Sequence, residues 1–470
     1  MFAGRDDVKI LLVSHRFPPE GTAGTETYSA DLAAALVGSG HEVHVFAAKK
    51  DVSLEDLSLS TRSAGEVTVH ELVNNLFYDD FRETWDHPRI EAIFDDLLGR
   101  LEPDVLHFQH LLYLSVGCVE AAARRDIPIV FTLHDYWLQC PRFGQRIHGD
   151  GSLCETIDFA RCGSCLPSFK WRQTPQERQI SAKVTRVRAK TGIDLTSLAR
   201  STASVLKKPA RGYVHPPALE VKEMEAAATV RAGELFGRVV PCVDLFLAPS
   251  RFLRERFVHE WGLHPTKIEI LRFGVDLERF ASVQRTRAEV LRVGFLGSLI
   301  AAKGPLLLLE AWGRIPRELR ARGSLVLYGP AQHQREYVAR LGEKAREVGA
   351  RLGGRLERAD VPRAHASLDL LVVPSIWFEN APLVIHEALA AGTPLLVSDL
   401  GGMAELVEEG RGGWRFRTGD ADDLAQRLSA LLVDRSPLAG IGADRPAIPT
   451  FRQHASEVLA LYEVLNCARS

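Results

Sequence analysis

The stretch SIWFENAPLVIHEALAAGTP, residues 375–394, decides how the rest of this chain is interpreted. The apolar run 370–374 leads into it and the apolar run 395–398 follows it, as expected for two buried strands of a parallel sheet. Between them, Pro382 suits the first position of a helix, and Gly392 suits the residue after its end. The stretch therefore predicts a strand–helix–strand unit with a loop at the carboxyl end of the first strand.

Two carboxylates lie in this unit, Glu379 in the loop and Glu387 in the second turn of the helix. Free N–H groups and the helix dipole favour a phosphate at the helix start. The start is formed by Asn380, Ala381, Pro382 and Leu383. A phosphate site flanked by two acceptors for hydroxyl groups suits a sugar nucleotide. The spacing alone also fits a plain amphipathic helix, on which Glu387 is a solvated side chain.

The run ENAPLVIHEALAAGTPLLVS, residues 379–398, resembles the donor-site signature of retaining glycosyltransferases of family 4, which have the two-domain GT-B fold. The resemblance implies transfer of a sugar from a UDP- or GDP-linked donor with retention at the anomeric carbon. Glu379 would stabilise the transition state at the sugar, and Glu387 would hold the ribose hydroxyls. The acceptor stays open as a glycan, a lipid-linked molecule or a small molecule, in glycan, polysaccharide or glycolipid biosynthesis.

The length and composition describe an ordinary globular chain of more than one domain. It has 470 residues, of which 46% are hydrophobic and 25% charged, and its net charge of −2 does not favour nucleic acid. No run reaches the roughly 20 apolar residues of a membrane span, and residues 1–9 do not read as a signal peptide. Seven cysteines argue against a complete disulfide framework. We expect a cytoplasmic, reduced protein.

Alternating strand and helix patterns predict an α/β chain, and the resemblance implies two Rossmann-like domains whose parallel sheets face a cleft. We expect an acceptor-binding domain at 1–276, which carries a cysteine-rich and basic helical insertion at about 140–238. A donor-binding domain follows at 277–450. The resemblance implies that the terminal helix, 451–470, crosses back to the first domain.

Two loops of the first half follow predicted strands. The loop after the strand 8–14 contains Gly24 and Glu26, which match part of the family's Gly-Gly-x-Glu loop, so the resemblance places Gly24 at the donor diphosphate. The strand 129–133 ends in His134, where open α/β sheets place ligands. A histidine there often has only a hydrogen-bonding role, but the resemblance places His134 beside the transferred sugar and makes it a catalytic candidate.

Lys303 precedes Gly304 at a predicted helix start, where a compact ammonium group suits a phosphate. The family often has an Arg earlier in this loop, at the position of Ser298, so we expect either that Lys303 carries that charge alone or that another Arg substitutes. The sequence Asp420-Ala-Asp422 has the spacing of a metal motif, but Asp420 is better explained as a helix cap. We therefore expect no catalytic divalent metal.

Four cysteines gather within a short segment: Cys140, Cys154, Cys162 and Cys165. The last pair has the C-x2-C spacing of a metal knuckle, which favours a structural zinc site, with an iron–sulfur cluster as the alternative. The competing interpretation is four separate small apolar residues. The family features do not require this cluster.

The segment 170–211 is helical in pattern and strongly basic. A solvated helix face is the commonest meaning of such a run, and peripheral contact with anionic lipid at the inner membrane face is the alternative.

Two other functions remain open. An epimerase or phosphorylase on the same fold would use similar donor residues, and a non-catalytic homologue would bind nucleotide sugar without turnover. The presence of Glu379, Glu387 and Lys303 argues against the non-catalytic homologue.

Overall fold

The computed structural model describes residues 7–167, 169–191, 217–281, 283, 288–331, 335–441 and 444–469. The chain forms two compact units. Unit 1 comprises Met1–Ala248, Arg256–Glu269 and Ala455–Ser470, and unit 2 comprises Pro249–Glu255 and Ile270–His454. Neither unit is one continuous stretch of sequence, because Pro249–Glu255 of unit 2 lies between two segments of unit 1, and Ala455–Ser470 at the end of the chain belongs to unit 1. No single boundary is therefore tested, and the predicted limits at 276 and 451 stay predictions.

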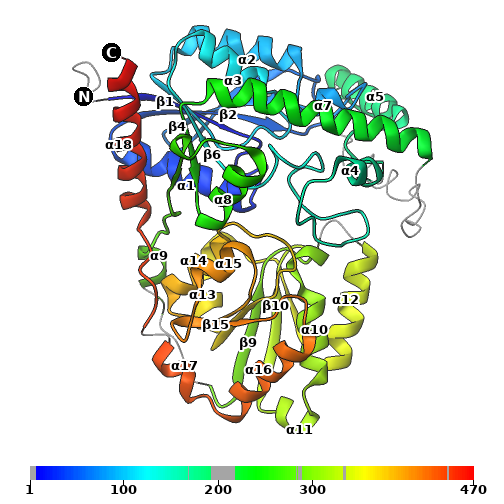
Figure 1. The fold of residues 1–470 in the computed structure, drawn as a ribbon, viewed down its shortest axis with the longest axis vertical. Helices are drawn as coiled ribbons and strands as arrows, with labels where there is room; N and C mark the ends of the chain where they lie inside the picture. Colours follow the sequence, from blue (N-terminus) through cyan, green and yellow to red (C-terminus); the bar gives the residue numbers. More distant parts are fainter. Residues whose placement is uncertain are drawn as a thin grey trace. The chain divides into compact units, whose positions relative to one another are not determined.

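Unit 1 is built on an eight-stranded sheet with the order β3-β4-β2-β1-β5-β6-β7-β8 (Figure 1). The bounds are β1 Lys9–Ser14, β2 Glu42–Lys49, β3 Leu59–Ala64, β4 Val67–Val73, β5 Val105–Phe108, β6 Ile129–Thr132, β7 Leu245–Ala248 and β8 Ile268–Ile270. From β4 through β7 the neighbouring strands pair in parallel, and β3 pairs antiparallel with β4. The carboxyl ends of β1, β5 and β6 consequently lie together at one edge of the sheet.

The helices of unit 1 connect and cover these strands. They are α1 Gly24–Gly38, η1 Arg82–Thr84, α2 Pro88–Leu101, α3 Gly117–Arg124, α4 Phe159–Cys165, α5 Pro175–Thr191, α7 Ala218–Cys242, α8 Arg251–Trp261, η2 Pro265–Lys267 and α18 Phe451–Arg469. The last of these reaches the sheet through Tyr462, whose hydroxyl lies 2.6 Å from His107 Nδ1 in β5. Residues of α18 from 455 onward belong to unit 1 for this reason.

The sequence analysis did not predict the hairpin of β3 and β4. Strand β3 is mostly exposed or half-buried and has no apolar run, so its composition resembles a loop. Gly65 makes the tight turn to β4 with a φ of +63°, a conformation that glycine adopts without strain. Pairing with β4 rather than local pattern makes this segment a strand.

Unit 2 is built on a seven-stranded parallel sheet with the order β11-β10-β9-β12-β13-β15-β14. The bounds are β9 Leu291–Leu296, β10 Gly323–Tyr328, β11 Arg351–Gly354, β12 Leu370–Val373, β13 Leu395–Ser398, β14 Glu408–Glu409 and β15 Gly412–Phe416. Alternate residues of β12 enter different cores: Leu370 and Val372 pack on one face, and Leu371 and Val373 on the other. Both faces of the sheet are therefore buried under helices, which explains the unbroken apolar runs in the sequence.

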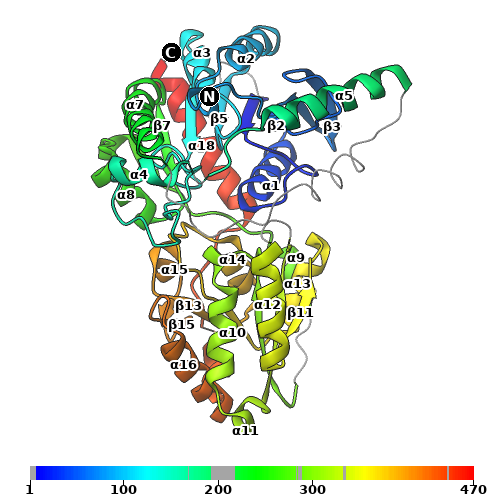
Figure 2. The same cartoon turned by 90° about the vertical axis from the view of Figure 1, so that its right-hand side faces the viewer.

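The helices of unit 2 are α9 Glu278–Ala281, η3 Ala301–Lys303, α10 Pro305–Arg314, α11 Arg317–Arg320, α12 Arg335–Val348, η4 Arg358–Asp360, α13 Val361–Ala366, α14 Leu383–Ala391, α15 Gly401–Leu406, α16 Ala421–Val433 and α17 Ser436–Ile441. Helix α10 packs against both α12 and α16 over one face of the sheet, and Figure 2 shows α10 and α12 side by side. Helices α13, α14 and α15 cover the other face. The predicted α/β class with two parallel-sheet domains is confirmed.

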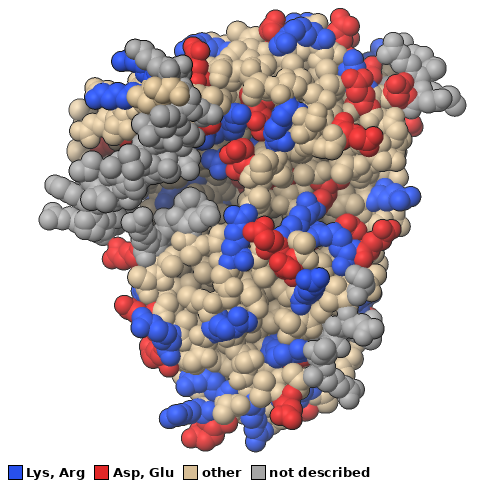
Figure 3. All heavy atoms as spheres, turned by 180° about the vertical axis from the view of Figure 1, so that it is seen from behind, with Lys and Arg blue, Asp and Glu red and all other residues tan. Residues whose placement is uncertain are grey.

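On one face of the described part of the chain, charged side chains of both signs are interspersed. On the face in Figure 3, Lys and Arg side chains lie among Asp and Glu side chains. Lys170, which precedes α5, pairs with Glu177 of that helix, and Arg178 of the helix pairs with Asp79. Part of the basic segment 170–211 lies outside the described residues. This part includes Arg200, Lys207, Lys208 and Arg211, and the side chains of Arg188 and Lys190.

Candidate active site

The loop between β12 and α14 holds Glu379 in a fixed orientation within unit 2. Its Oε1 accepts hydrogen bonds from Ser375 Oγ at 3.0 Å and from Trp377 Nε1 at 2.7 Å, and it forms an ion pair with Lys303 Nζ. Among the described residues, Oε2 receives no hydrogen bond, although the side chain is 9% exposed. One oxygen is thus held by the protein while the other is available to a ligand.

Lys303 reaches Glu379 because the loop after β9 packs against the end of β12. Gly304 follows with a φ of +68°, and a Cβ there would lie 1.9 Å from the carbonyl oxygen of Pro374. The amide of Ile376 donates to the carbonyl of Ala302 at 2.9 Å. These contacts bring Lys303 Nζ to 5.3 Å from the Trp377 ring centroid, on the same side as Glu379. The sequence analysis selected both residues but not their contact.

Helix α14 begins one residue later than the sequence analysis predicted, because Pro382 precedes the helix and does not occupy its first position. The structure places Pro382 in the extended N-cap position, so that Leu383 begins the helix. Extended backbone is as compatible with a proline φ as the first helical position is, which explains the shift of one residue. Asn380 and Ala381 lie buried just before it, and Gly392 ends the helix with a φ of +66° as predicted.

A second element fixes this loop from outside. The amide of Gly402, in α15, donates to the carbonyl of Glu379 at 2.8 Å. A Cβ at Gly402 would lie 1.5 Å from the carbonyl oxygen of Asn380, so only glycine permits this approach. The loop that carries Glu379 is therefore held between α15 and the segment of Lys303.

Glu387 lies on α14 with its side chain 23% exposed, and its Oε2 is 3.8 Å from Nε2 of the buried His365. The sequence analysis had no reason to select His365, which lies on α13. The structure shows Glu387 as partly accessible and leaves its ribose role a prediction.

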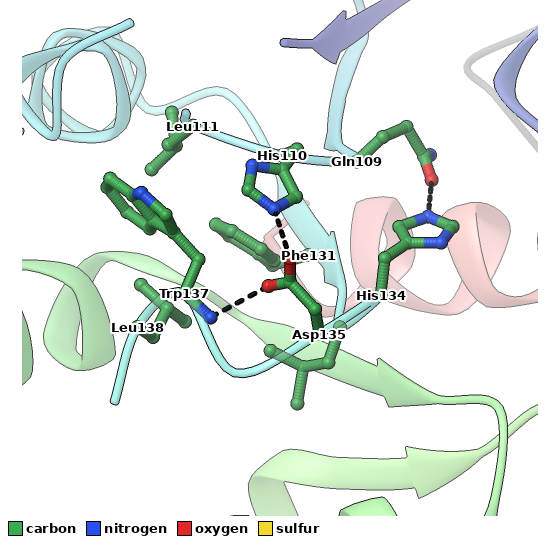
Figure 4. A pocket seen from close by; sticks show the side chains of 9 residues that line it. Gln109, His110, Leu111, Phe131, His134, Asp135, Trp137 and Leu138 are labelled. Atoms are coloured by element: carbon green, nitrogen blue, oxygen red, sulfur yellow. Dashed lines mark hydrogen bonds and ion pairs between the residues drawn. The ribbon is translucent and has the colours of Figure 1, made fainter. Parts of the chain in front are cut away.

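A second cluster of polar side chains lies in unit 1, where β5 and β6 end (Figure 4). His134 Nε2 donates to Gln109 Oε1 at 2.9 Å, and its ring packs edge-on against Tyr28 at 4.9 Å. His110 Nε2 donates to Asp135 Oδ2 at 3.1 Å, and Asp135 Oδ1 accepts from the Trp137 amide at 2.7 Å. The predicted His134 thus belongs to a small pocket with two pairs of polar side chains.

The charges of this cluster follow from its burial. Burial raises the pKa of Asp135, but the interaction with His110 and the hydrogen bonds from His110 and Trp137 outweigh this effect, so the net pKa is lowered. His110 Nδ1 accepts from the Leu112 amide at 2.9 Å, which leaves the proton on Nε2 facing Asp135. Asp135 is therefore an ionised carboxylate at neutral pH.

His15 and Glu26 extend the cluster toward α1. His15 Nε2 lies 3.2 Å from Glu26 Oε1, and its ring centroid is 4.7 Å from that of His110. Burial lowers the pKa of His15, with the nearby His110 adding to the effect. A neutral His15 can donate from Nε2 to Glu26 Oε1, whereas His15 Nδ1 and Glu26 Oε2 are buried without a hydrogen-bond partner among the described residues. Sequence reasoning missed four site residues that lie just after the carboxyl ends of β1, β5 and β6: His15, Gln109, His110 and Asp135.

Gly24 begins α1, and a Cβ built on it would meet nothing within 4 Å. Protein packing therefore does not require glycine there, and its predicted donor contact stays a prediction. Gly21 is different, because its Cβ would lie 2.6 Å from Glu26 Oε1 and 2.9 Å from Arg16 Cβ.

In the described part of the chain, neither the cysteine cluster nor the Asp420-Ala-Asp422 sequence, for which a metal site was not expected, forms a ready cation site. In the part of the chain that the structure describes, no three His, Cys, Asp or Glu side chains have the arrangement of metal ligands. Cys140, Cys154, Cys162 and Cys165 are nonetheless all buried. Asp420 accepts from the amides of Asp422 and Asp423, each at 2.9 Å, which confirms it as the cap of α16.

Two family models match this chain, one in each half. Residues 22–165 match the model described as Glycosyltransferase Family 4, and residues 291–434 match that described as Glycosyl transferases group 1. The two matches cover more than half of the sequence and include the loops of Gly24, His134, Lys303 and Glu379. The chain belongs to glycosyltransferase family 4.

Relatives of this family 4 protein include D-inositol 3-phosphate glycosyltransferases. The protein of that name from Kribbella flavida is 29% identical over 213 residues, which are 42% of this chain and 50% of the relative. A second from Catenulispora acidiphila, named D-inositol 3-phosphate glycosyltransferase 2, is 30% identical over 222 residues, 44% of this chain and 52% of the relative. The matches therefore span about half of the length of these relatives.

Solved structures share the two-domain fold. HepE of Anabaena, crystallised in complex with UDP and glucose, has a TM-score of 0.61 and 17% identity over 97% of this chain and 99% of its own. Sucrose-phosphate synthase of Thermosynechococcus elongatus has a TM-score of 0.65 and 16% identity over 99% of this chain and 100% of its own. At these identities the likeness establishes the GT-B fold. Among the described residues, no helix is long and apolar enough to span a membrane.

Proposed function

We propose that this family 4 protein transfers a sugar from a nucleoside diphosphate sugar to an acceptor hydroxyl, with retention at the anomeric carbon. The orientation of Glu379 carries the proposal, because three donors hold Oε1 while Oε2 receives none from the described residues. A buried, preoriented carboxylate can accept a sugar hydroxyl and stabilise positive charge that develops on the ring. The ionised carboxylate needs no reorganisation when that charge appears.

The leaving diphosphate is assigned to Lys303 and to the first turn of α14. Lys303 is 26% exposed and is linked to the Glu379 loop, so an anion bound at the head of α14 lies within reach of its ammonium group. The first-turn amides of α14 and its dipole add favourable interactions with phosphate. Because these groups can neutralise the diphosphate, we propose that the reaction needs no catalytic divalent metal.

The donor is proposed to be UDP- or GDP-linked. The fold likeness to HepE, which was crystallised with UDP-glucose, supports a nucleoside diphosphate sugar but does not choose the base or the sugar. Glu387 is partly exposed on α14 and suits the ribose hydroxyls. Gly24 at the start of α1 is assigned to the diphosphate by the family resemblance.

His134 and the neighbouring Gln109 are proposed to contact the transferred sugar or the acceptor. Both are hydrogen-bonding side chains at the ends of adjacent strands, so they can be oriented against hydroxyl groups. A glycan, a lipid-linked molecule or a small polyol would all present such hydroxyls. The D-inositol 3-phosphate relatives favour testing phosphorylated polyols first.

A donor panel tests the proposal. The purified protein is incubated with UDP- and GDP-sugars, with and without candidate acceptors, while nucleoside diphosphate release is measured. Acceptor-dependent release, with a product of retained anomeric configuration by NMR, supports the transferase. A changed nucleotide sugar without acceptor consumption supports an epimerase, phosphate-dependent release of sugar 1-phosphate supports a phosphorylase, and binding without turnover supports the non-catalytic homologue.

Peripheral membrane contact stays a separate proposal. The pairs Lys170–Glu177 and Arg178–Asp79 reduce the net charge of the basic segment, while Lys183 and Arg186 are exposed on α5. Sedimentation with anionic and neutral vesicles decides it, since binding by charge requires anionic lipid and weakens with salt.

A further inference from the structure

The four clustered cysteines lie on two small structural elements of unit 1. A hairpin joins Ile147 to Leu153, and its end is fixed by the amide of Cys154, which donates to the carbonyl of Arg146 at 2.9 Å. The short helix α4 carries Cys162 and Cys165 three residues apart, on one face. Cys140 ends a tight turn, with its amide 2.7 Å from the carbonyl of Tyr136.

The four cysteine side chains are all buried. Each is 7–8% exposed, and the electrostatic surroundings of Cys162 include the other three sulfurs. His148 Nδ1 lies 3.3 Å from Cys165 Sγ, and Cys154 Sγ donates to the Thr156 carbonyl at 3.3 Å. Cys162 also packs with Ala228 of α7, so the cluster lies against that helix. The remaining cysteines, Cys118, Cys242 and Cys467, lie elsewhere.

Arg231 of α7 is a buried cation beside this cluster. It is 2% exposed, donates from Nη2 to the Trp137 carbonyl at 2.6 Å, and stacks on the Trp137 ring at 4.8 Å. Within the described ranges, its Nη1 has no acceptor and the side chain has no carboxylate in a salt bridge. The acidic groups near enough to interact with it are Cys140, Asp135 and Cys162.

The charge of Arg231 requires an anion. Burial lowers its pKa to about 10, so the guanidinium is still charged at neutral pH. A buried charge without a direct ion pair is strongly unfavourable, and the ionised Asp135, although near enough to interact with Arg231, forms no salt bridge with it in the described part of the chain. Neutral thiols supply no counter-charge, whereas metal-bound thiolates do.

We propose that Cys140, Cys154, Cys162 and Cys165 bind one zinc ion as four thiolates, and that Arg231 is the charge partner of this centre. On binding, the four thiols lose their protons to solvent and four sulfur–metal bonds form, which gives the centre a net charge of about −2. Arg231 offsets part of that charge. A protonated His148 Nδ1 donates to the Cys165 thiolate as an outer-shell hydrogen bond.

Zinc must draw the sulfurs together, because the described side chains do not yet stand in ligand geometry. We propose that side-chain rotations and a shift of the loop between the hairpin and α4 supply this movement. The hydrogen bond from Cys154 to Thr156 is given up when that thiol ionises.

Gly144 connects the proposed zinc centre to the pocket that contains His110 and Asp135. This residue lies in the cysteine loop with a φ of +76°, and a Cβ on it would be 2.8 Å from Asp135 Cγ and 2.8 Å from the Trp137 amide. The loop therefore supports the side chain that orients His110. Loss of the zinc ion should therefore raise the acceptor KM more than the Kd for nucleoside diphosphate. This expectation rests on the proposed function.

Elemental analysis of anaerobically purified protein provides the direct test. We expect about one zinc per chain, lost in Cys162→Ser and retained in Cys118→Ser, which alters a buried cysteine outside the cluster. Absence of zinc and iron, or full zinc retention in Cys162→Ser, would overturn the site, and iron in place of zinc would overturn the choice of metal. This measurement needs no activity, so its failure is distinct from failure of the proposed transferase.

Two further measurements cover the case in which Cys162→Ser does not fold. Titration of the unaltered protein with a mercurial should release zinc in step with modification of about four thiols, and release without thiol modification would refute thiolate ligation. Cobalt exchanged for zinc should show intense thiolate-to-metal absorption typical of tetrahedral sulfur ligation.

The role of Arg231 is tested separately. Arg231→Met, a neutral side chain of similar length, should lose zinc to a chelator at least about tenfold faster, and an unchanged rate would remove Arg231 from the proposal.

Discussion

Lys303 Nζ and Glu379 Oε1 form an ion pair although the two residues are 76 positions apart in the sequence. Ser375 and Trp377 donate to the same oxygen, so Glu379 keeps two hydrogen-bond donors when Lys303 moves. A diphosphate that attracts Lys303 would therefore loosen the ion pair without leaving the carboxylate unsatisfied. The pair links the nucleotide and sugar ends of the proposed donor site.

Glu379→Gln is expected to lower turnover by about 10²–10³-fold, as for loss of a preorganised electrostatic contact. The amide retains the shape of the side chain but not its negative charge. Initial rates with a saturating donor measure the effect, with thermal unfolding as the check on folding. Glu347→Gln, on the exposed surface of α12, is the matched control and should be unchanged. Near-normal turnover in folded Glu379→Gln would contradict the assignment.

Lys303→Ala should weaken nucleoside diphosphate binding by about 1.5–3 kcal/mol, the range for a charge-assisted hydrogen bond. Calorimetry with UDP and GDP measures the change. Lys344→Ala is the matched control, because Lys344 is the other lysine after Lys267 in the sequence and is paired with Glu347 on the surface. Equal affinities for the two variants would mean that another group holds the diphosphate.

Activity is expected to persist in EDTA and to need no added Mg²⁺ or Mn²⁺, because Lys303 and the α14 amides can neutralise the leaving group. Rates before and after chelation measure this. Asp420→Asn separates the two interpretations of Asp420, since a capping side chain tolerates the change and a catalytic metal ligand does not. Strict dependence on a divalent cation, with loss of activity in Asp420→Asn, would contradict the model.

Gly402→Ala should lower activity sharply, because its methyl group would lie 1.5 Å from the Asn380 carbonyl oxygen and displace the Glu379 loop. Gly342→Ala in α12 is the contrast, since a Cβ there meets nothing within 4 Å and alanine favours helix by up to about 1 kcal/mol. Turnover and unfolding free energy of both variants test the difference. Full activity in Gly402→Ala would show that the loop does not need this contact.

His454 predicts an acid-sensitive unit 2. Burial, reinforced by the nearby His386, lowers the pKa of His454 from 6.5 to about 4. Above about pH 6.5 neither the folded nor the unfolded state binds the proton, so the group costs nothing. Below it the unfolded state binds a proton that the folded state excludes, and stability falls until about pH 4.

The effect between pH 7 and pH 5 is about 2 kcal/mol at most. In His454→Gln this part of the loss should vanish, as measured by denaturant unfolding at the two pH values. His259→Gln, at an exposed position of α8, should retain the dependence of the unaltered protein. A His454→Gln profile that matches the unaltered protein would exclude the histidine as the cause.

The sequence by itself determined the elements whose signals are local. Apolar runs of four or five residues marked β12 and β13, since strands buried on both faces have no polar alternation. Gly392 marked the end of α14 and Asp420 the start of α16, because cap residues act on backbone within one turn. The 379–398 run also carried the family resemblance.

Only the tertiary structure decided which distant residues meet. His107 and Tyr462 are 355 positions apart, Arg231 and Trp137 are 94 apart, and neither pair has a sequence signature. Their contacts depend on strand order and helix packing, which bring together groups separated by long stretches of chain. The β3–β4 hairpin is decided in the same way, because β3 has a strand's hydrogen bonds but no strand's hydrophobic pattern. The sequence thus identified Glu379, Lys303 and His134 as candidate site residues, whereas tertiary packing decided their partners and brought His110 and Asp135 into the same pocket as His134.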